Sequence, residues 1–301
     1  MEVEQMVIEH EQGISLEPTS RARLWHKFMR NPIGLLGLLI LATVVFCAVF
    51  SPWVAPHSPT KQSLLSRFNP PAWVQGGSTK HLLGTDQVGR DILSRIIYGA
   101  RISLIVGIFS VTISLMIGVT LGLMSGFFGG RIDQLIMTIV DIMLAFPGII
   151  LALAFVAVLG PSLKNIIIVL GVTGWERYAR VVRAETLAFR EQEFVIAARA
   201  IGASSLKIMA RHIFPNTISS IIVMGTLQTA TNILAEASLS FLGLAPGSTN
   251  PTWGQMIATS RDFVSVAWWL PTFPGFAILL TVLAINLVGD RLRDVLDPKV
   301  L

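Results

Sequence analysis

The chain has 301 residues, of which 52% are hydrophobic and only 14% are charged, and its formal net charge is +5. Soluble domains carry about 25% charged residues, so this composition excludes an ordinary soluble domain and indicates a protein of the lipid bilayer. The single cysteine, Cys47, excludes a disulfide within the chain. In a membrane protein, an excess of positive charge is typical of cytoplasmic loops rather than of nucleic-acid binding.

The predicted elements begin with a polar segment, residues 1–33, that is expected to lie in the cytoplasm and not to be a cleaved signal. A helix that crosses the bilayer needs about 20 mostly apolar residues, because each residue rises about 1.5 Å through a hydrocarbon core about 30 Å thick. We expect a first transmembrane helix at 34–54, an extracytoplasmic loop with a short helix at 55–100, a five-helix core at 101–295 and a cytoplasmic tail at 296–301. The expected fold class is an all-α membrane protein.

Six spans are expected in all. They lie at 34–54, within 102–130, at 134–160, from 165 onward, at 217–242 and within 263–289. The fourth turns polar at "WERYARVVRAE", so its second half is expected at the cytoplasmic edge. Lys and Arg gather before the first span, between the fourth and the fifth, and after the sixth, as is typical of cytoplasmic loops. An even number of spans puts these three segments on one side, so both termini are expected in the cytoplasm.

Between the fourth and fifth spans lies a charged loop that contains "EFVIAARAIGASSLKIMARHIFPN". Ala197 and Ala198 favour helix and leave a low surface for close packing. Gly202 can take the left-handed conformation that ends a helix, and Ser204 or Ser205 can cap the next one. The pattern predicts two short helices with a bend at Gly202. An amphipathic connector that rests on lipid headgroups is the alternative.

This loop, at 189–215, resembles the EAA loop of ABC importer permeases, whose pattern is EAA, three residues, Gly, nine residues and I-x-L-P. The chain has IAA, three residues, Gly202, nine residues and HIFP, so that Ile196, His212 and Phe214 depart from the pattern. In that family the loop forms coupling helices that dock in a groove of the cytoplasmic ATPase subunit. The resemblance implies these ATPase-coupling residues: Ala197, Ala198, Gly202, Ala203, Ser204, Ser205 and Pro215, the last of which marks the start of the fifth span.

Further segments keep their order over most of the chain and are similar to the C-type permease of dipeptide and oligopeptide ABC importers. They are "PPAWVQGGS" at 70–78, "HLLGTDQVGRDILSRIIYGARISL" at 81–104, "VDIMLAFP" at 140–147, "ILAEASLSFLGL" at 233–244 and "GDRLRDVLDPK" at 289–299. The resemblance implies a six-helix permease with a cytoplasmic coupling loop, in a bacterial or archaeal inner membrane. The implied function is inward transport of short peptides, dipeptides foremost; nickel and glutathione permeases, which share much of the pattern, are the alternatives.

The resemblance also implies partners. They are a homologous second permease subunit, two cytoplasmic P-loop ATPase subunits, an extracytoplasmic peptide-binding protein and membrane lipid. The sequence contains no G-x-x-x-x-G-K-[ST] motif, so ATP and Mg²⁺ are expected on the ATPase subunits, and no cofactor, metal or catalytic residue is expected on this chain. Basic clusters without base-stacking aromatic residues do not indicate nucleic-acid binding.

Polar residues inside the expected spans are functional candidates, because such groups face a bundle interior or water rather than lipid. Those proposed for the translocation path or its gate are Asp141, Asn232, Glu236 and Asn286. For Asp141 the structural alternative is a pair with Arg131 or Arg177. A secondary transporter would also need acids on its path, but the inverted repeats typical of that class are not found in the sequence. An intramembrane enzyme would need a paired nucleophile and base, which the sequence does not offer.

Two more patterns concern packing. The pairs Asp86–Arg90 and Asp91–Arg95 are each four residues apart and predict a short helix stabilised by ~0.3 kcal/mol per pair. That helix is expected to cap the entrance or to contact a substrate-delivery protein; the alternative is simple packing on the second span.

The second span carries small residues at every fourth position, which let another helix approach closely. They are Ser110, Ser114, Gly118, Gly122, Gly126 and Gly130.

Overall fold

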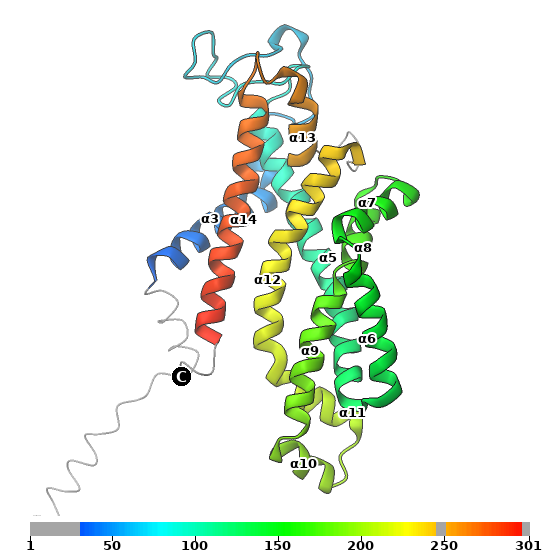
Figure 1. The fold of residues 1–301 in the computed structure, drawn as a ribbon. Helices are drawn as coiled ribbons and strands as arrows, with labels where there is room; N and C mark the ends of the chain where they lie inside the picture. Colours follow the sequence, from blue (N-terminus) through cyan, green and yellow to red (C-terminus); the bar gives the residue numbers. More distant parts are fainter. Residues whose placement is uncertain (1–30, 245–250, 297–301) are drawn as a thin grey trace, which may run out of the picture.

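The computed structural model describes residues 31–244 and 251–296, and these fold into helices joined by loops (Figure 1). Within the described residues there is no strand, and one isolated antiparallel bridge joins Thr85 to Asp91. The all-α class expected from the sequence is therefore confirmed. The N-terminal segment before residue 31 and the tail after residue 296 lie outside the described residues, so the expectations for them stay predictions.

The helices fall into two groups by length. The longer ones are α3 (Pro32–Val49), α5 (Ile92–Phe128), α6 (Gly130–Ala145), α7 (Gly148–Leu159), α8 (Leu163–Val172), α9 (Trp175–Arg190), α12 (Phe214–Leu239) and α14 (Trp269–Leu296). The shorter ones are α4 (Ser51–Val54), η1 (Leu64–Ser66), α10 (Glu193–Ala200), α11 (Ser205–Ile208), η2 (Met209–Ile213), η3 (Ser240–Leu244), α13 (Trp253–Ser260) and η4 (Arg261–Phe263).

The number of membrane spans differs from the sequence-based expectation. Among the described residues, four helical stretches are long and apolar enough to cross a membrane: α3, α5, the continuous run from α11 to η3, and α14. The count becomes five if α6 and α7, which meet at an angle of 88°, form one bent span. The expected count of six is thus not reproduced by length and composition. The fourth expected span is split into α8 and α9 around Thr173 and Gly174, and α9 is the polar half.

Helix α5 starts ten residues earlier than the apolar run within 102–130 indicates, at Ile92. Asp91 is the reason, because its Oδ2 accepts hydrogen bonds from the backbone N–H of Ser94 at 2.8 Å and from the Ser94 hydroxyl at 2.7 Å. A side chain in this position satisfies a backbone donor that the first turn of a helix leaves unpaired. The charged start of α5 thus belongs to the same helix as its apolar span.

Helix α5 packs closely on α9, because the glycines on the contacting face of α5 have no side chains to hold the two helices apart. A Cβ atom at Gly122 would lie only 2.7 Å from the carbonyl oxygen of Ala179, and Cβ atoms at Gly118 and Gly126 would also come too close to α9. The close helix approach predicted from the small residues of the second span is therefore confirmed. Gly130 is an exception, since a Cβ atom there would meet no described atom within 4 Å.

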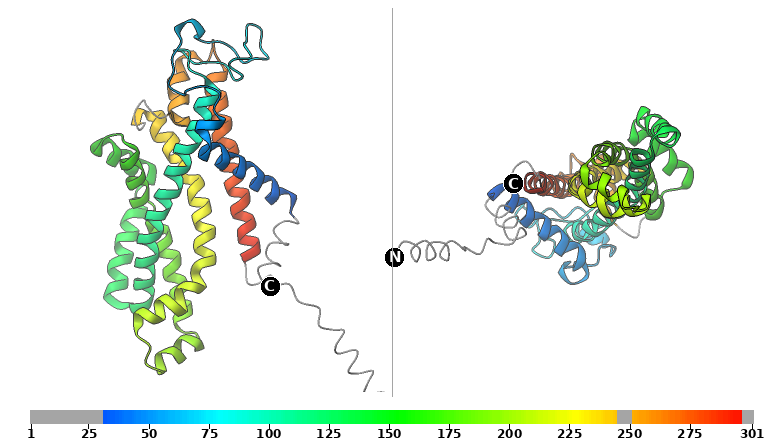
Figure 2. Two further views of the ribbon diagram at one scale, coloured as in Figure 1. Left: turned by 180° about the vertical axis from the view of Figure 1, so that it is seen from behind. Right: turned by 90° about the horizontal axis from the view of Figure 1, so that it is seen from below.

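The two ends of the helical bundle differ in construction. At one end, residues 55–91 form a layer of loops beside α13, here called the loop layer (Figure 1). At the other end, α10 and α11 project beyond the long helices; residues 193–208 are here called the tip (Figures 1 and 2). The long helices lie between the loop layer and the tip, so a membrane crossed by these helices would separate the two.

Candidate functional site

A cavity of about 370 Å³ lies where two helix pairs are interrupted. Its first wall is the bend between α6 and α7 at Phe146 and Pro147, and its second is the break between α8 and α9 at Thr173 and Gly174. The third wall is α12. Backbone that leaves the helical conformation at membrane depth is tolerated where it lines a cavity, and small-molecule sites have volumes of about 300–1,000 Å³. This cavity is therefore the candidate for a path through the bundle.

The sequence accounts for both interruptions. Pro147 has no backbone N–H and cannot continue α6, so the chain turns and α7 begins at Gly148. The second interruption is held against α5, because the Ser114 hydroxyl donates a hydrogen bond to the Gly171 carbonyl at 2.8 Å. A Cβ atom at Gly174 would lie 3.0 Å from the Ser114 Oγ. The small residues Ser114 and Gly174 thus let the broken helix pair press against α5.

Polar side chains of α12 line the third wall of the cavity, and a hydrogen-bond chain holds two of them in place. Gln228 Nε2 donates to Asn232 Oδ1 at 2.9 Å, and Asn232 Nδ2 donates to Ser110 Oγ on α5 at 2.7 Å. Asn232 is nearly buried, and Thr231 lies beside it on the same wall. Amide side chains carry both donors and acceptors, so this wall can bond either kind of group on a passing molecule.

Two charged residues from the first turn of α9 complete the polar lining. Glu176 is 6% exposed, and its Oε2 has no hydrogen-bond partner among the described residues. Arg177, the next residue, is exposed. Neither Glu176 nor Gln228 is predicted from the sequence as a site residue. A signal that could have indicated Glu176 is the pair Thr173-Gly174, because these residues interrupt an apolar run immediately before a charged one.

Asn232 is the one member of the four predicted path residues that lines this cavity. Glu236, one turn further along α12, is fully buried: Ser240 Oγ donates to its Oε1 at 2.7 Å, and the Thr252 hydroxyl lies 3.3 Å from Ser240 Oγ. Glu236 thus pairs with a polar neighbour on its own helix run, which is the structural alternative to a role in the path. Asn286 is half-buried on α14 and is not among the residues that line the cavity. Path or gate roles for Glu236 and Asn286 stay predictions.

Asp141 forms an ion pair, but with a different partner from those expected. Its carboxylate on α6 pairs with Arg180 of α9, and both side chains are more than half exposed. The predicted pairing of Asp141 with Arg131 or Arg177 is therefore wrong, because the register between α6 and α9 cannot be read from the sequence. That register also brings Arg183 to Asp133, where the guanidinium Nη2 donates to Oδ2 at 2.6 Å and Nε donates to Oδ1 at 2.5 Å.

The tip has the predicted form of two short helices with a bend between them. Gly202 has φ = +81° and ends α10, while Ser204 precedes the first residue of α11. The Ser204 hydroxyl makes no capping hydrogen bond to α11 within the described residues. Pro215 lies in the first turn of α12, yet α11 runs through the π-helical turn η2 into α12 without a break. The second short helix is therefore the beginning of the fifth expected span.

The residues predicted to couple to an ATPase do not share one environment. Ala198 is 5% exposed and packs with Val195, Ile208 and Ile213 in a small core of the tip. Ala197, Gly202, Ser204 and Ser205 are exposed, and Ala203 is half-buried. Four large apolar side chains also project from the tip. Their exposed fractions are 42% for Phe194, 51% for Ile196, 86% for Ile201 and 73% for Leu206.

The loop layer holds the first predicted ion pair but not the second. Arg90 Nε lies 2.6 Å from Asp86 Oδ2, as expected from their spacing. Arg95, however, turns toward Asp86, at 3.9 Å, and donates to the Pro59 carbonyl at 3.2 Å, leaving Asp91 to cap α5. The short helix expected here is not formed between residues 81 and 91. Positive φ angles at Gly84 and Gly89 turn the chain instead.

Two family models match this chain. Residues 118–301 match the binding-protein-dependent transport system inner membrane component. Residues 19–71 match the N-terminal transmembrane domain of oligopeptide transport permease C. The two matches together cover the tip, the cavity and the first predicted span.

Individual proteins are also similar over nearly the whole chain. The di/tripeptide transport system permease protein DppC of Pseudomonas aeruginosa (strain UCBPP-PA14) is 46% identical over 282 residues, which is 94% of this chain and 93% of that protein. The dipeptide transport system permease protein DppC of Escherichia coli (strain K12) is 47% identical over 281 residues, 93% of this chain and 94% of that protein. A solved structure of the MetNI methionine ABC transporter in inward-facing conformations matches with a TM-score of 0.54 at 20% identity. The match covers 66% of this chain and 95% of the MetNI chain. The helical fold and the sequence matches agree, and the chain belongs to the family of binding-protein-dependent transport system inner membrane components.

Proposed function

We propose that this chain is the permease subunit of an ATP-driven importer that moves short peptides, dipeptides foremost, through the inner membrane into the cytoplasm. The observation that carries the proposal is the identity of 46% and 47% to two DppC permeases over more than nine-tenths of the chain. Those proteins are named for di/tripeptide and dipeptide transport. The alignment includes the broken helices around the cavity, so the relatives would build their path from the same elements.

The cavity has chemistry that suits a short peptide. A dipeptide carries an amide N–H, a carbonyl oxygen, an ammonium group and a carboxylate. The amides of Gln228 and Asn232 complement the peptide bond, while Glu176 and Arg177 offer charges opposite to the two ends. Neighbouring apolar residues from the α6–α7 bend would accept side chains of many kinds. A path of this composition would bind peptides by their common backbone groups.

The tip supports the proposed coupling to a motor. In this proposal the tip lies in the cytoplasm, and its exposed apolar side chains dock on a P-loop ATPase subunit. The loop layer faces outward, where a peptide-binding protein delivers cargo, and a homologous second permease completes the path. Nucleotide-driven closure of two ATPase subunits would then shift the bundle between inward-open and outward-open populations.

The proposal assigns ATP and Mg²⁺ to the ATPase subunits, because this chain has no phosphate-binding loop motif. Its own side chains bind and guide the peptide and transmit movement; they perform no covalent step. The permease is therefore a transport subunit rather than an enzyme.

The composition of the complex is the first test. The tagged chain is purified in mild detergent from its own membranes, the co-purifying proteins are identified, and ATPase activity is measured. We expect a second permease and P-loop ATPase subunits. Recovery of the chain alone, as a homo-oligomer that conducts or exchanges ions without ATP, would replace the proposal with a secondary transporter.

The cargo is tested separately with the reconstituted complex in proteoliposomes. Labelled dialanine is expected to accumulate when ATP and the binding protein are present, and unlabelled dipeptides are expected to compete. Glutathione and Ni²⁺ serve as alternative cargoes in the same assay. Uptake of either one in place of dialanine would retain the importer and reject the peptide assignment.

A further inference from the structure

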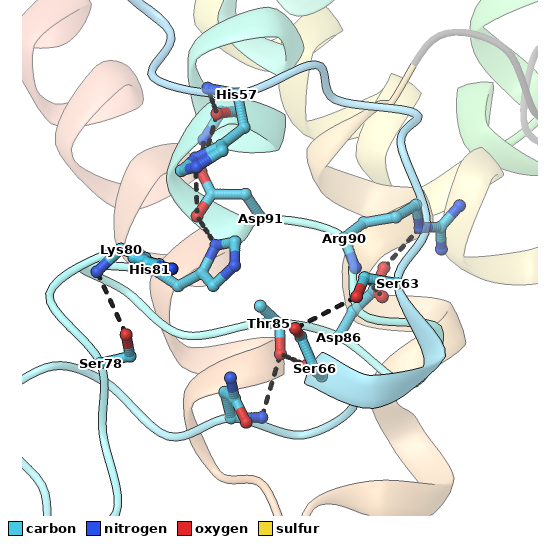
Figure 3. Close-up of polar contacts among 12 residues, drawn as sticks. His57, Ser63, Ser66, Ser78, Lys80, His81, Thr85, Asp86, Arg90 and Asp91 are labelled. Atoms are coloured by element: carbon cyan, nitrogen blue, oxygen red, sulfur yellow. Dashed lines mark hydrogen bonds and ion pairs between the residues drawn. The ribbon is translucent and has the colours of Figure 1, made fainter.

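A cluster of two histidines and one aspartate lies in the loop layer, outside the cavity and the tip. His57, His81 and Asp91 each offer one metal-ligating atom, and these atoms all lie within 4.8 Å of one another. Figure 3 shows the two imidazoles approaching the Asp91 carboxylate from different sides. The three residues come from a loop after α4, a turn in the middle of the layer, and the residue that caps α5.

The acid of the cluster is held rigidly. Asp91 is 2% exposed, and its Oδ2 accepts hydrogen bonds from the N–H and the hydroxyl of Ser94. Its Oδ1 is thereby left to face the two imidazoles. A ligand carboxylate oriented by hydrogen bonds on its other oxygen is the usual arrangement around a bound metal. The same Ser94 hydroxyl accepts the backbone N–H of His57 at 3.0 Å, which ties the first histidine to the acid.

The second histidine is positioned by a tight turn. The His81 carbonyl accepts the backbone N–H of Gly84 at 2.9 Å. Gly84 has φ = +81°, and a Cβ atom on it would lie 2.5 Å from the Asn69 carbonyl oxygen, so this turn requires glycine. The Gly84 carbonyl in turn accepts the N–H of Ile92, the first residue of α5. The turn therefore carries His81 to the acid at the start of that helix.

Distances within the cluster suit a small divalent ion. The Asp91 Oδ1 lies 2.9 Å from His81 Nδ1 and 3.8 Å from His57 Nδ1. A tetrahedral ion with bonds of 2.0–2.1 Å keeps neighbouring ligand atoms about 3.3 Å apart, a value between these two distances. The imidazole rings are also close, with centroids 4.7 Å apart. Small side-chain rotations would bring all three atoms to one ion.

Hydrogen bonding alone leaves part of the cluster unexplained. The His81–Asp91 contact satisfies one imidazole nitrogen. His57 Nδ1, in contrast, is buried and has no hydrogen-bond partner among the described residues, although the rest of its side chain is partly exposed. A buried polar atom without a partner is costly and uncommon in native structures. A metal ion shared with Asp91 would provide that partner.

We propose that His57, His81 and Asp91 bind a divalent transition-metal ion, Zn²⁺ best, that clamps the loop layer to the start of α5. Two imidazoles and one carboxylate favour Zn²⁺ and its neighbours over Mg²⁺ and Ca²⁺, which prefer oxygen ligands. Three protein ligands leave one position to water, which fits the partial exposure of His57. The ion joins the loop after α4 to the His81 turn and to the start of α5, so it stabilises the loop layer. The site does not depend on the nature of the transported cargo.

The test measures metal binding by the purified full-length chain, carrying a tag without histidine. Its background variant replaces the other histidines and the cysteine, His10, His26, His212 and Cys47, with alanine or serine. We expect one equivalent of Zn²⁺ to remain after dialysis, Co²⁺ to give the absorption of a tetrahedral site, and Zn²⁺ but not Mg²⁺ to raise the melting temperature.

Ligand variants make the assignment specific. His57→Ala and His81→Asn should each lower the Zn²⁺ affinity by more than about tenfold, the lower limit seen for loss of a supporting residue. Asp91→Asn keeps an oxygen to accept the Ser94 N–H, so the α5 cap survives while the anionic ligand is lost. Absence of stoichiometric Zn²⁺ in the background variant would overturn the proposal, as would unchanged Zn²⁺ affinity in His57→Ala and His81→Asn. Neither result would bear on peptide transport.

Discussion

At the scale of single residues, Asn232 connects the packing of the bundle with its cavity. Its side chain lines the cavity and also joins α12 to α5 through Ser110, a residue 122 positions away in the sequence. Gln228 Nε2 donates to the single side-chain oxygen of Asn232. Because both the oxygen and the nitrogen of the Asn232 amide are paired, this side chain keeps one orientation when no cargo is bound, and less ordering is needed when a peptide arrives.

Replacing Asn232 with Leu should therefore impair transport more than folding. Asn232→Leu keeps a similar volume but leaves the Gln228 amide without its partner, and a buried hydrogen bond is worth about 1 kcal/mol. We expect dipeptide uptake per folded chain to fall roughly fivefold. The matched control is Asn165→Leu on α8, since Asn165 also loses a side-chain hydrogen bond, to the Leu159 carbonyl, but does not line the cavity and is not a predicted path residue. Equal losses of uptake in both variants, each normalised to membrane abundance, would contradict a cavity role for Asn232.

The two ion pairs between α6 and α9 should differ in their contribution to stability. Asp133 and Arg183 are less than one-third exposed and meet through two hydrogen bonds, whereas Asp141 and Arg180 are more than half exposed. Asp133→Asn should lower the free energy of unfolding by about 2 kcal/mol, and Asp141→Asn by less than about 1 kcal/mol. Thermal scans of both variants in one detergent check the order. A larger effect at Asp141 would indicate that lipid or a partner subunit covers that pair.

At the scale of helices, the tip separates residues that hold its shape from residues that are free to dock. Ala198 is buried against Ile208 and Ile213, so Ala198→Trp would disrupt the tip itself. Ile201 is 86% exposed and offers a sharper test of docking.

The variant Ile201→Glu should leave the melting temperature of the isolated chain unchanged and abolish co-purification of the ATPase subunits. The reason is that docking would remove the new carboxylate from water without giving it an opposite charge or a hydrogen bond in return. Val266→Glu is the control, because Val266 is 72% exposed and lies in the segment between η4 and α14, at the loop-layer end of the bundle (Figure 1). Retention of the ATPase by Ile201→Glu would argue against a docking role for the apolar side chains of the tip.

The close contact between α5 and α9 makes a second prediction at this scale. Gly122→Ala would place a methyl group 2.7 Å from a backbone carbonyl oxygen of α9, so we expect a loss of about 1–3 kcal/mol from overpacking. Gly275→Ala on α14 meets no described atom within 4 Å and should gain up to about 1 kcal/mol of helix propensity. Melting temperatures of the purified variants should therefore move in opposite directions. Equal shifts would mean that the α5–α9 contact is less tight than described.

At the scale of the whole molecule, the sequence predicts the apolar helices α3, α5, α12 and α14 because long uncharged runs have few alternatives to a bilayer-spanning helix. It does not predict the 88° angle between α6 and α7, although Pro147 marks the place. The cavity depends on that angle and on contacts such as Asn232–Ser110 between distant segments. For the same reason Asn232 could be selected as a candidate but not separated from Glu236, because contacts between distant segments decide which of the two positions lines the cavity.

The loop layer and the tip lie at opposite ends of the long helices, and this leads to a direct topology prediction. The chain has a single cysteine, so Cys47→Ser gives a background free of thiols. In that background, Leu65→Cys introduces a fully exposed thiol in the loop layer and Ser205→Cys an exposed thiol in the tip. If the Lys- and Arg-rich segments are cytoplasmic, a membrane-impermeant thiol reagent should label Leu65→Cys in intact spheroplasts and Ser205→Cys only after lysis. The reverse pattern would invert the orientation, and with it the side on which cargo enters; labelling of both before lysis would mean that the described long helices do not separate the two ends.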